Sequence, residues 1–191
     1  MTGFEVIRHA DLRETPWANG AGTTRQVASA PADSGIDSFD WRISIAEVAG
    51  DCAFSAFPGI DRTIMLVEGE AMVLAIDGRR RPLEPFVPAG FPGEADVTCT
   101  VPRGPTRDLN VMCRRGAWSG SVDVLDARAS LAVESFVGGA LFLCAFGCRW
   151  EVLEPVALSL EPGDFVRLTR DAVVRASGPV IRIRLTSHPC A

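Results

Sequence analysis

The 191-residue chain contains no lysine and no tyrosine, so all 19 of its basic residues are arginine. A chain without lysine cannot form a lysine Schiff base or place a Walker-type lysine on a phosphate group. A chain without tyrosine has no tyrosine general acid. The two histidines, His9 and His188, both lie close to a terminus. These absences exclude several common kinds of active site.

The six cysteines include no C-x-x-C pair, and most of them lie within apolar runs. We interpret them as small buried hydrophobic residues, and the spacing of Cys144 and Cys148 as strand packing rather than a metal site. The chain does not begin with a basic segment followed by an apolar stretch, as a secretory signal would. We therefore expect a cytoplasmic protein whose thiols stay reduced. The cysteines are Cys52, Cys99, Cys113, Cys144, Cys148 and Cys190.

The charge and hydropathy of the chain exclude further classes of partner. A net charge of -5 repels a phosphate backbone, so we expect no nucleic acid partner. With 47% hydrophobic and 23% charged residues, the composition is that of a globular domain, neither disordered nor membrane-spanning. The arginine tracts 79–81 and 114–115 lie beside turn-like residues, and we interpret them as solvated loop charge rather than an anion-binding patch.

Short runs of valine, isoleucine, leucine and phenylalanine recur along the chain between Gly, Pro, Asp and Ser clusters. This pattern predicts an all-β protein with almost no helix, built as a sandwich or barrel. The interval 87–94 contains too many helix breakers for a helix and reads as an ordered turn. We predict strands at 23–28, 41–48, 63–68, 71–76, 96–101, 108–113, 131–136, 140–146, 149–153, 156–160, 164–168, 172–176 and 180–186.

The two halves of the chain are alike in outline, which indicates a weak internal duplication. Each half has turns such as Glu68-Gly69-Glu70 and Glu161-Pro162-Gly163 leading into apolar strands. The composition briefly becomes polar near 126–130, so we place the boundary there. We expect an N-terminal domain at 1–126 that carries the pocket and a C-terminal domain at 127–191, packed as one body.

Four segments before residue 115 combine polar and aromatic residues in ways that packing alone does not predict. Arg62 is the strongest binding candidate, because its guanidinium can hold a carboxylate with two hydrogen bonds; the alternative is a structural ion pair with Asp61, Glu47 or Asp108. Glu47 shares a strand face with apolar residues, and either lines a cavity or lies at a solvent-exposed strand end. Asp108 and Asn110 face one way, toward a cavity or a buried hydrogen-bond network.

The glycine-rich stretch after Trp17 also has two interpretations. Gly20 and Gly22 let backbone N–H groups approach an anion or a neighbouring strand, or they form a tight turn on which Trp17 packs. The segments in question are W-A-N-G-A-G-T-T-R at 17–25, F-D-W-R-I-S-I-A-E-V at 39–48, F-S-A-F-P-G-I-D-R-T at 54–63 and R-D-L-N-V-M at 107–112.

In this order and at these intervals, the four segments closely resemble the HutD/Ves family of bacterial proteins, over about the first 115 residues. The resemblance implies a bicupin, that is, two cupin-like β-barrels in one chain, and a possible homodimer. It also implies a link to histidine utilisation, through sensing or limiting pathway intermediates. Carried over by position, the family pattern places around one ligand-binding pocket Trp17, Asn19, Thr24, Arg25, Arg42, Glu47, Phe57, Asp61, Arg62, Asp108 and Asn110.

Cupins generally hold a metal with an H-x-H pair, a glutamate and a later histidine, but the stretch 56–62 contains no histidine. Two histidines cannot supply a three-histidine site, so we expect no intrinsic metal and no cofactor.

Three functions remain open. The leading one is a metabolite-binding protein in which Arg62 anchors a carboxylate, Asn110 and the backbone at 19–22 give hydrogen bonds, and Trp17 and Phe57 form an apolar wall. By resemblance, the ligand is urocanate or a formyl- or formimino-glutamate. The second is a metal-free hydrolase or isomerase with Glu47 or Asp108 as general base. The third is a protein-interaction module with a vestigial pocket.

Overall fold

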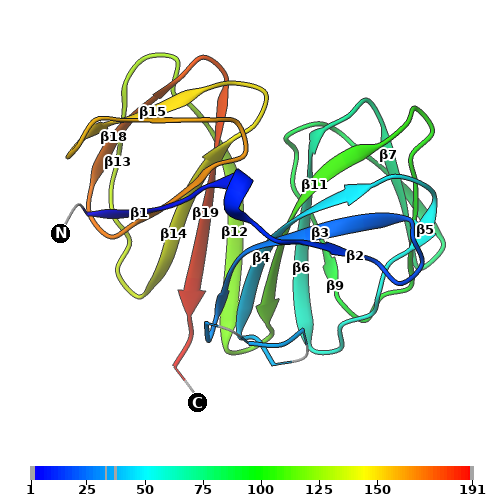
Figure 1. Ribbon diagram of the computed structural model, residues 1–191. Coiled ribbons are helices and arrows are strands. Elements are labelled where there is room, and N and C mark those ends of the chain that lie inside the picture. Colours follow the sequence, from blue (N-terminus) through cyan, green and yellow to red (C-terminus); the bar gives the residue numbers. More distant parts are fainter. Residues whose placement is uncertain (1–2, 33, 37, 190–191) are drawn as a thin grey trace. The chain divides into compact units, whose positions relative to one another are not determined.

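The computed structural model describes residues 3–32, 34–36 and 38–189 (Figure 1). In this part of the chain, the regular elements are β-strands together with one single-turn 3-10 helix, His9–Asp11. None of these elements is a helix long and apolar enough to cross a membrane. The prediction of an all-β chain is confirmed.

The chain divides into two compact units, which we call the first and the second unit. The first comprises residues 13–119 with 188–189, and the second comprises residues 3–12 with 120–187. We had expected a single boundary at residue 126. The two units instead meet between residues 119 and 120, within β12 (Trp118–Asp126), and the first residues of the chain belong to the second unit. They do so because β1 (Phe4–Ile7) pairs with β17 (Phe165–Leu168), a long-range pairing that leaves no local signal in composition.

The first unit consists of two sheets around one apolar core. Its six-stranded sheet has the order β2-β3-β4-β11-β6-β9, and its four-stranded sheet the order β5-β10-β7-β8. Ile64, Leu66, Leu74 and Val97 belong to the core between them. The strands are β2 (Glu14–Pro16), β3 (Gly22–Ala30), β4 (Trp41–Val48), β5 (Cys52–Ala53), β6 (Ile60–Glu68), β7 (Met72–Ile76), β8 (Arg79–Leu83), β9 (Ala89–Pro92), β10 (Val97–Thr100) and β11 (Thr106–Arg114).

The second unit repeats this plan with a five-stranded sheet, β1-β17-β14-β19-β12, and a four-stranded sheet, β13-β18-β15-β16. Its core contains Trp150, Leu143, Val166 and Val174, all almost completely buried. Figure 1 shows β14 and β19 running alongside each other, as their antiparallel register requires. The remaining strands are β13 (Leu131–Val133), β14 (Gly139–Ala145), β15 (Trp150–Glu154), β16 (Leu158–Leu160), β18 (Ala172–Ala176) and β19 (Pro179–Ser187).

Six strands lie where the sequence did not predict them: β1, β2, β5, β8, β9 and β12. β9 lies within the interval that we interpreted as a turn; it is an edge strand paired with β6, and edge strands tolerate proline and glycine. β8 contains the arginine tract 79–81, which is solvent-exposed as expected but belongs to a strand and not a loop. The long strand β12 is an edge strand in which exposed residues alternate with less exposed ones, and only Val122 is buried, so it lacks a strong apolar signal.

The second arginine tract is not simply solvated loop charge. Arg114 donates to the backbone oxygen of Phe39 at 2.6 Å and pairs with Asp40. Arg115 pairs with both Asp61 and Glu94. These contacts join segments that are far apart in the sequence, so the tract has a structural role within the first unit.

The cysteines are free thiols where the structure describes them. Cys99, Cys113 and Cys144 are buried, as expected for small hydrophobic residues, whereas Cys52 and Cys148 are half-buried. Cys190 lies outside the described residues. Burial raises the pKa of the Cys99 and Cys113 thiols to about 12, so both stay protonated near neutral pH.

Candidate functional site

One face of the six-stranded sheet in the first unit carries polar side chains in register. Met112 on β11 is the register partner of Arg42 on β4 and of Arg62 on β6. One step along β11, Asn110 is the partner of Ser44, which in turn pairs with Gln26 on β3. Because successive residues on a strand point to opposite faces, residues two apart on each strand share this face.

These side chains line a cavity of about 610 Å³, a size typical of small-molecule sites. The turn between β2 and β3 and the segment after β5 complete its wall. The lining residues are Thr15, Trp17, Ala18, Asn19, Thr24, Gln26, Ile36, Arg42, Ser44, Ala46, Ala53, Phe54, Ser55, Phe57, Arg62, Asn110 and Met112. Two arginines and no carboxylate occur among them, which makes the wall cationic. Seven residues of the predicted set belong to this lining: Trp17, Asn19, Thr24, Arg42, Phe57, Arg62 and Asn110.

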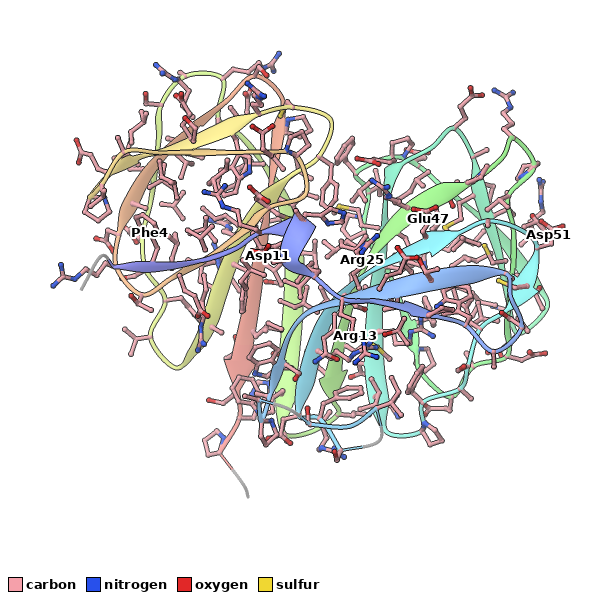
Figure 2. The ribbon with its side chains drawn as sticks, in the orientation of Figure 1. Phe4, Asp11, Arg13, Arg25, Glu47 and Asp51 are labelled. Atoms are coloured by element: carbon pink, nitrogen blue, oxygen red, sulfur yellow. The ribbon has the colours of Figure 1, made fainter. Side chains whose placement is uncertain are left out.

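Three residues of the predicted set are absent from the lining and form ion pairs elsewhere in the first unit. Arg25 pairs with Glu14, and Glu47 with Arg107. Asp61 pairs with Arg115. Each of the three is adjacent in sequence to a lining residue, so strand alternation turns it to the other face. Arg25 and Glu47 are labelled in Figure 2. The structure thus places these three side chains outside the lining of the cavity, whereas the family pattern had placed them around it.

Asp108 is also absent from the lining, but it lies directly behind it. It is fully buried, and its Oδ1 accepts a hydrogen bond of 2.6 Å from Asn110 Nδ2. Asn110 Oδ1 accepts in turn from Arg62 Nη2 at 3.0 Å. The three residues form a buried chain from Asp108 through Asn110 to Arg62, so the cavity and the hydrogen-bond network that we had considered as alternatives are both present.

The Arg62 guanidinium is buried and has no direct carboxylate partner. The residue is only 7% exposed, and its Nη1 makes a long hydrogen bond of 3.4 Å to the Ser55 backbone oxygen. Within the described residues, no carboxylate oxygen lies within 4.0 Å of its nitrogens, and Nε has no hydrogen-bond partner. The structural ion pair considered for Arg62 is therefore absent. A buried charge without a paired charge is costly, unless a ligand supplies one.

Aromatic rings offset part of that cost. The guanidinium carbon lies 5.4 Å, 5.5 Å and 5.1 Å from the ring centroids of Phe54, Phe57 and Phe91. A cation within about 6 Å of an aromatic ring is attracted by the ring's quadrupole. These rings also fix the orientation of Arg62, so its position is set before any ligand arrives.

The pKa values of Arg62 and Asp108 shift in opposite directions, and burial is the main cause of both shifts. Burial lowers the pKa of Arg62 to about 10, with Asp108 opposing the change, so the guanidinium stays protonated near neutral pH. Burial raises the pKa of Asp108 to about 7, although Arg62 and the Asn110 hydrogen bond both act to lower it. Asp108 therefore changes charge close to neutral pH.

The glycine-rich stretch forms the tight turn that we had considered for it. Trp17 N donates to Gly22 O, and Gly20 N donates to Trp17 O. A Cβ at Gly22 would lie 2.3 Å from the Glu47 backbone oxygen and about 3.0 Å from the Trp17 ring, so only glycine fits there. The turn positions the indole, whose Nε1 donates to Thr24 Oγ1 at 2.7 Å and whose ring packs edge-on against Phe54.

Several lining residues were not among the predicted site residues. Ser44 shares its strand face with Arg42, and Met112 shares its face with Asn110, so alternation alone could have included both. Gln26 accepts a hydrogen bond from Arg42 Nε at 2.9 Å, but an irregularity between Gln26 and Ala28 shifts the register of β3 just beyond it. The phenyl ring of Phe54 and the backbone of Ser55 reach the site through a loop, which strand periodicity does not describe.

The lining does not fit a metal ion. It offers amide, hydroxyl and thioether groups but no histidine, cysteine or carboxylate. Across the residues described in the structure, no group of three or more His, Cys, Asp or Glu side chains could hold a metal. The expectation that the protein has no intrinsic metal stays a prediction, to be decided by elemental analysis.

Two curated bacterial proteins are similar to parts of this chain. Protein Ves of Citrobacter koseri is 38% identical over 125 residues, which is 63% of this chain and 64% of Ves. The uncharacterized 21.2 kDa protein in the hutC 3′ region of Pseudomonas putida is 37% identical over 113 residues, 59% of each chain. The chain thus spans about three fifths of the length of each of these relatives.

Solved structures match over nearly the whole chain. HutD from Pseudomonas fluorescens SBW25, solved in a formate condition, is 27% identical with a TM-score of 0.83, covering 97% of this chain and 100% of that one. A cupin 2 conserved barrel domain protein from Leptotrichia buccalis has a TM-score of 0.61 at 8% identity, covering 96% of each chain, and so shows the fold alone. Together with the repeated pairs of sheets, these matches confirm the prediction of a cupin-type fold with two barrels.

Family membership follows from a match over most of the chain, and not only over the four segments that first suggested it. The model of the HutD family matches residues 9–182. This range includes all the lining residues of the cavity and most of the second unit. The chain belongs to the HutD family.

Proposed function

We propose that this protein binds a small carboxylate-bearing metabolite in the cavity of the first unit, and that binding serves to regulate or limit histidine utilisation. The observation that carries the proposal is the buried Arg62 guanidinium, which has a preset position and no carboxylate within 4.0 Å in the described chain. A ligand carboxylate supplies the missing charge and accepts charge-assisted hydrogen bonds.

The rest of the cavity fits the same class of ligand. Arg42 adds a second positive charge on the same sheet face, and Asn110, Ser44 and Gln26 offer polar groups. Trp17, Phe54 and Phe57 provide an apolar wall for the body of a ligand. The solved HutD of Pseudomonas fluorescens was obtained in a formate condition, which makes formate, the smallest carboxylate, a suitable probe. On family membership, urocanate and a formyl- or formimino-glutamate are the larger candidates.

The enzymatic alternative receives less support from the geometry. Of the two carboxylates considered as general bases, Glu47 pairs with Arg107 away from the cavity and Asp108 lies behind Asn110. Neither reaches the cavity wall, where a general base has to be within hydrogen-bond reach of its substrate. The homodimer, the cytoplasmic location and the role in histidine utilisation stay predictions.

The test compares ligand-induced thermal shifts of the wild type with those of Arg62→Met. A ligand at a hundred times its Kd stabilises the protein by about 2.7 kcal/mol, which raises Tm by roughly 5 to 10 °C. Formate, urocanate and N-formylglutamate are screened in turn. Arg62→Met removes the charge but keeps much of the bulk, and should weaken binding by about 2 to 5 kcal/mol.

Arg103→Met is the matched control, because Arg103 is an exposed arginine of the same unit that pairs with Glu70 away from the cavity. It should respond to ligand as the wild type does. Comparing ligand-induced shifts, not absolute Tm values, separates binding from any loss of stability in Arg62→Met. A full response of Arg62→Met to the ligand that stabilises the wild type would contradict the proposed carboxylate anchor.

A further inference from the structure

We propose that the cavity takes up a proton together with its carboxylate ligand, and that the proton goes to Asp108, which positions Asn110 and Arg62 from behind the wall. This inference rests on the proposed function, because it concerns the same cavity. It adds that the ligand is bound as an anion plus one proton from solvent. Asp108 acts through Asn110 and does not contact the ligand.

The hydrogen-bond chain shows how Asp108 acts on the wall. An amide side chain has a donor end and an acceptor end, and Asp108 Oδ1 accepts from the donor end of Asn110. The acceptor end of Asn110 is thereby directed at Arg62 Nη2. Asp108 Oδ2 is buried without a partner, so it can take a proton while the Asn110 hydrogen bond at Oδ1 stays intact.

The charged and titratable groups around Asp108 come from β4, β6, β10 and β5 with the residue before it. Arg62 on β6 is the cation that favours the carboxylate form, and Arg42 on β4 is close enough to lower the pKa of Arg62. From the opposite sheet come the thiols of Cys52 on β5 and Cys99 on β10, and the negative charge of Asp108 raises the pKa of both. Asp51, before β5, acts on the same two thiols.

Asp108 is the member of this group that changes charge near neutral pH. Arg62 stays protonated there, because its pKa falls only to about 10. Burial and nearby negative charge raise the pKa of both thiols, so they stay neutral. Burial brings the pKa of Asp108 to about 7, which places its titration in the range where a bound anion would alter it.

The positive charge of Arg62 stabilises both the ligand carboxylate and the Asp108 carboxylate, so the two negative charges lie near the same guanidinium. Like charges in a low-dielectric site raise each other's affinity for protons. When the ligand arrives as an anion, Asp108 therefore takes a proton from solvent onto Oδ2, and no covalent bond other than this O–H bond forms. By linkage, the ligand binds more tightly at low pH, where Asp108 is already neutral, and more weakly at high pH.

The experiment measures formate binding by titration calorimetry from about pH 6 to about pH 8.5, a range that brackets the Asp108 titration. Formate stays ionised throughout, so its own protonation does not contribute. We expect affinity to fall as pH rises, by up to about tenfold for each pKa unit by which the ligand shifts Asp108. Near pH 7, the heat of binding should depend on the ionisation enthalpy of the buffer, which reports uptake of a fraction of one proton.

Asp108→Asn mimics the protonated carboxyl, because its amide oxygen still accepts from Asn110 while it carries no charge. This variant should bind formate with little pH dependence and without proton uptake. Asp51→Asn is the matched control. Asp51 is a nearby carboxylate that accepts a hydrogen bond from Val101 N, and it is not one of the hydrogen-bonded residues that connect Asp108 to Arg62. It should keep the pH dependence of the wild type.

A second measurement does not depend on the folding of any variant. The carboxyl carbon of Asp108 is followed by NMR in the wild type over the same pH range, with and without saturating formate. Its titration should move to higher pH when formate is bound. Formate binding without proton uptake and without this movement would overturn the inference alone, whereas no formate binding at any pH, in calorimetry or at the NMR signals of the cavity, would contradict the proposed function as well.

Discussion

The two units of the chain share one plan of paired sheets, but they treat buried charge differently. In the second unit, the buried charged side chain among the described residues is Asp164, and both of its carboxylate oxygens accept hydrogen bonds from the same unit. It accepts from Arg8 Nη1 at 2.7 Å and from the backbone N–H groups of His9 and Glu161, each at 2.9 Å. In the first unit, Arg62 and Asp108 are both buried, and each keeps a polar atom without a partner.

We interpret the buried charge of the second unit as structural and that of the first unit as part of a binding site. A buried polar group without a partner costs about 1 to 3 kcal/mol, so a fold that keeps such groups gives up stability unless a ligand satisfies them. Asp164 fastens β1 and the 3-10 helix to the loop before β17, and this function requires no ligand. Arg62 lines a cavity whose wall holds only uncharged and cationic side chains, and Asp108 lies behind that wall in contact with Asn110.

The largest expected effect tests the cost of burying Asp108. Its pKa is about 7 in the folded protein against an ordinary 3.8, so between these values the folded state binds more protons than the unfolded state. Wild-type stability therefore falls as pH rises through this window, by up to about 4 kcal/mol, and Asp108→Asn lacks this loss. Urea unfolding of both proteins at a series of pH values measures the difference. Parallel stability curves would show that Asp108 is ionised throughout and that the buried charge is better solvated than its surroundings indicate.

The opposite side of the comparison is tested at Asp164. Asp164→Ala removes the acceptor of two backbone N–H groups and the partner of the half-buried Arg8, so we expect a loss of about 3 kcal/mol in unfolding free energy. Binding of formate in the first unit should stay unchanged, because Asp164 takes no part in that site. A variant of wild-type stability, or one that loses formate binding, would contradict the purely structural role assigned to Asp164.

A smaller effect is expected from Arg42→Met, which removes the second cation of the cavity. Arg42 is only partly buried and already donates to Gln26. Solvent screens its charge more than that of Arg62, so formate binding should weaken by about 1 kcal/mol, roughly fivefold. Calorimetry on Arg42→Met and Arg62→Met under one set of conditions gives the ranking. An equal or larger loss for Arg42→Met would make Arg42 the principal anchor.

The smallest effect is expected at Glu47, a residue that the sequence placed in the site and the structure places outside it. Its side chain is 46% exposed and pairs with Arg107, which is 37% exposed. Pairs of this kind contribute about 0.5 kcal/mol, so Glu47→Gln should unfold almost as the wild type does and bind formate equally well. Loss of binding in this variant while the protein stays folded would show that Glu47 takes part in ligand binding.

Much of the site could be predicted because it lies on strands with regular alternation. The family resemblance predicted Arg42, Arg62 and Asn110 as site residues. Each of them is also a polar residue in an otherwise apolar strand, which supported the prediction. Carrying the family pattern across position by position also brought in neighbours such as Arg25 and Asp61, which alternation turns to the opposite face. The Phe54 ring and the Ser55 backbone were missed, since a loop carries no periodic signal that would place them.

The sequence by itself determined the all-β class, most of the strands, the positions that carry unusual polarity and the shortage of metal ligands. Each of these follows from local composition and from the two-residue period of a strand. Only the tertiary structure decided that β1 completes the second unit, that β9 closes the edge of the six-stranded sheet, and that Asp108 lies behind Asn110. These features depend on pairing between segments far apart in the chain, and the free energy of such pairing is a property of the assembled sheets rather than of any one segment.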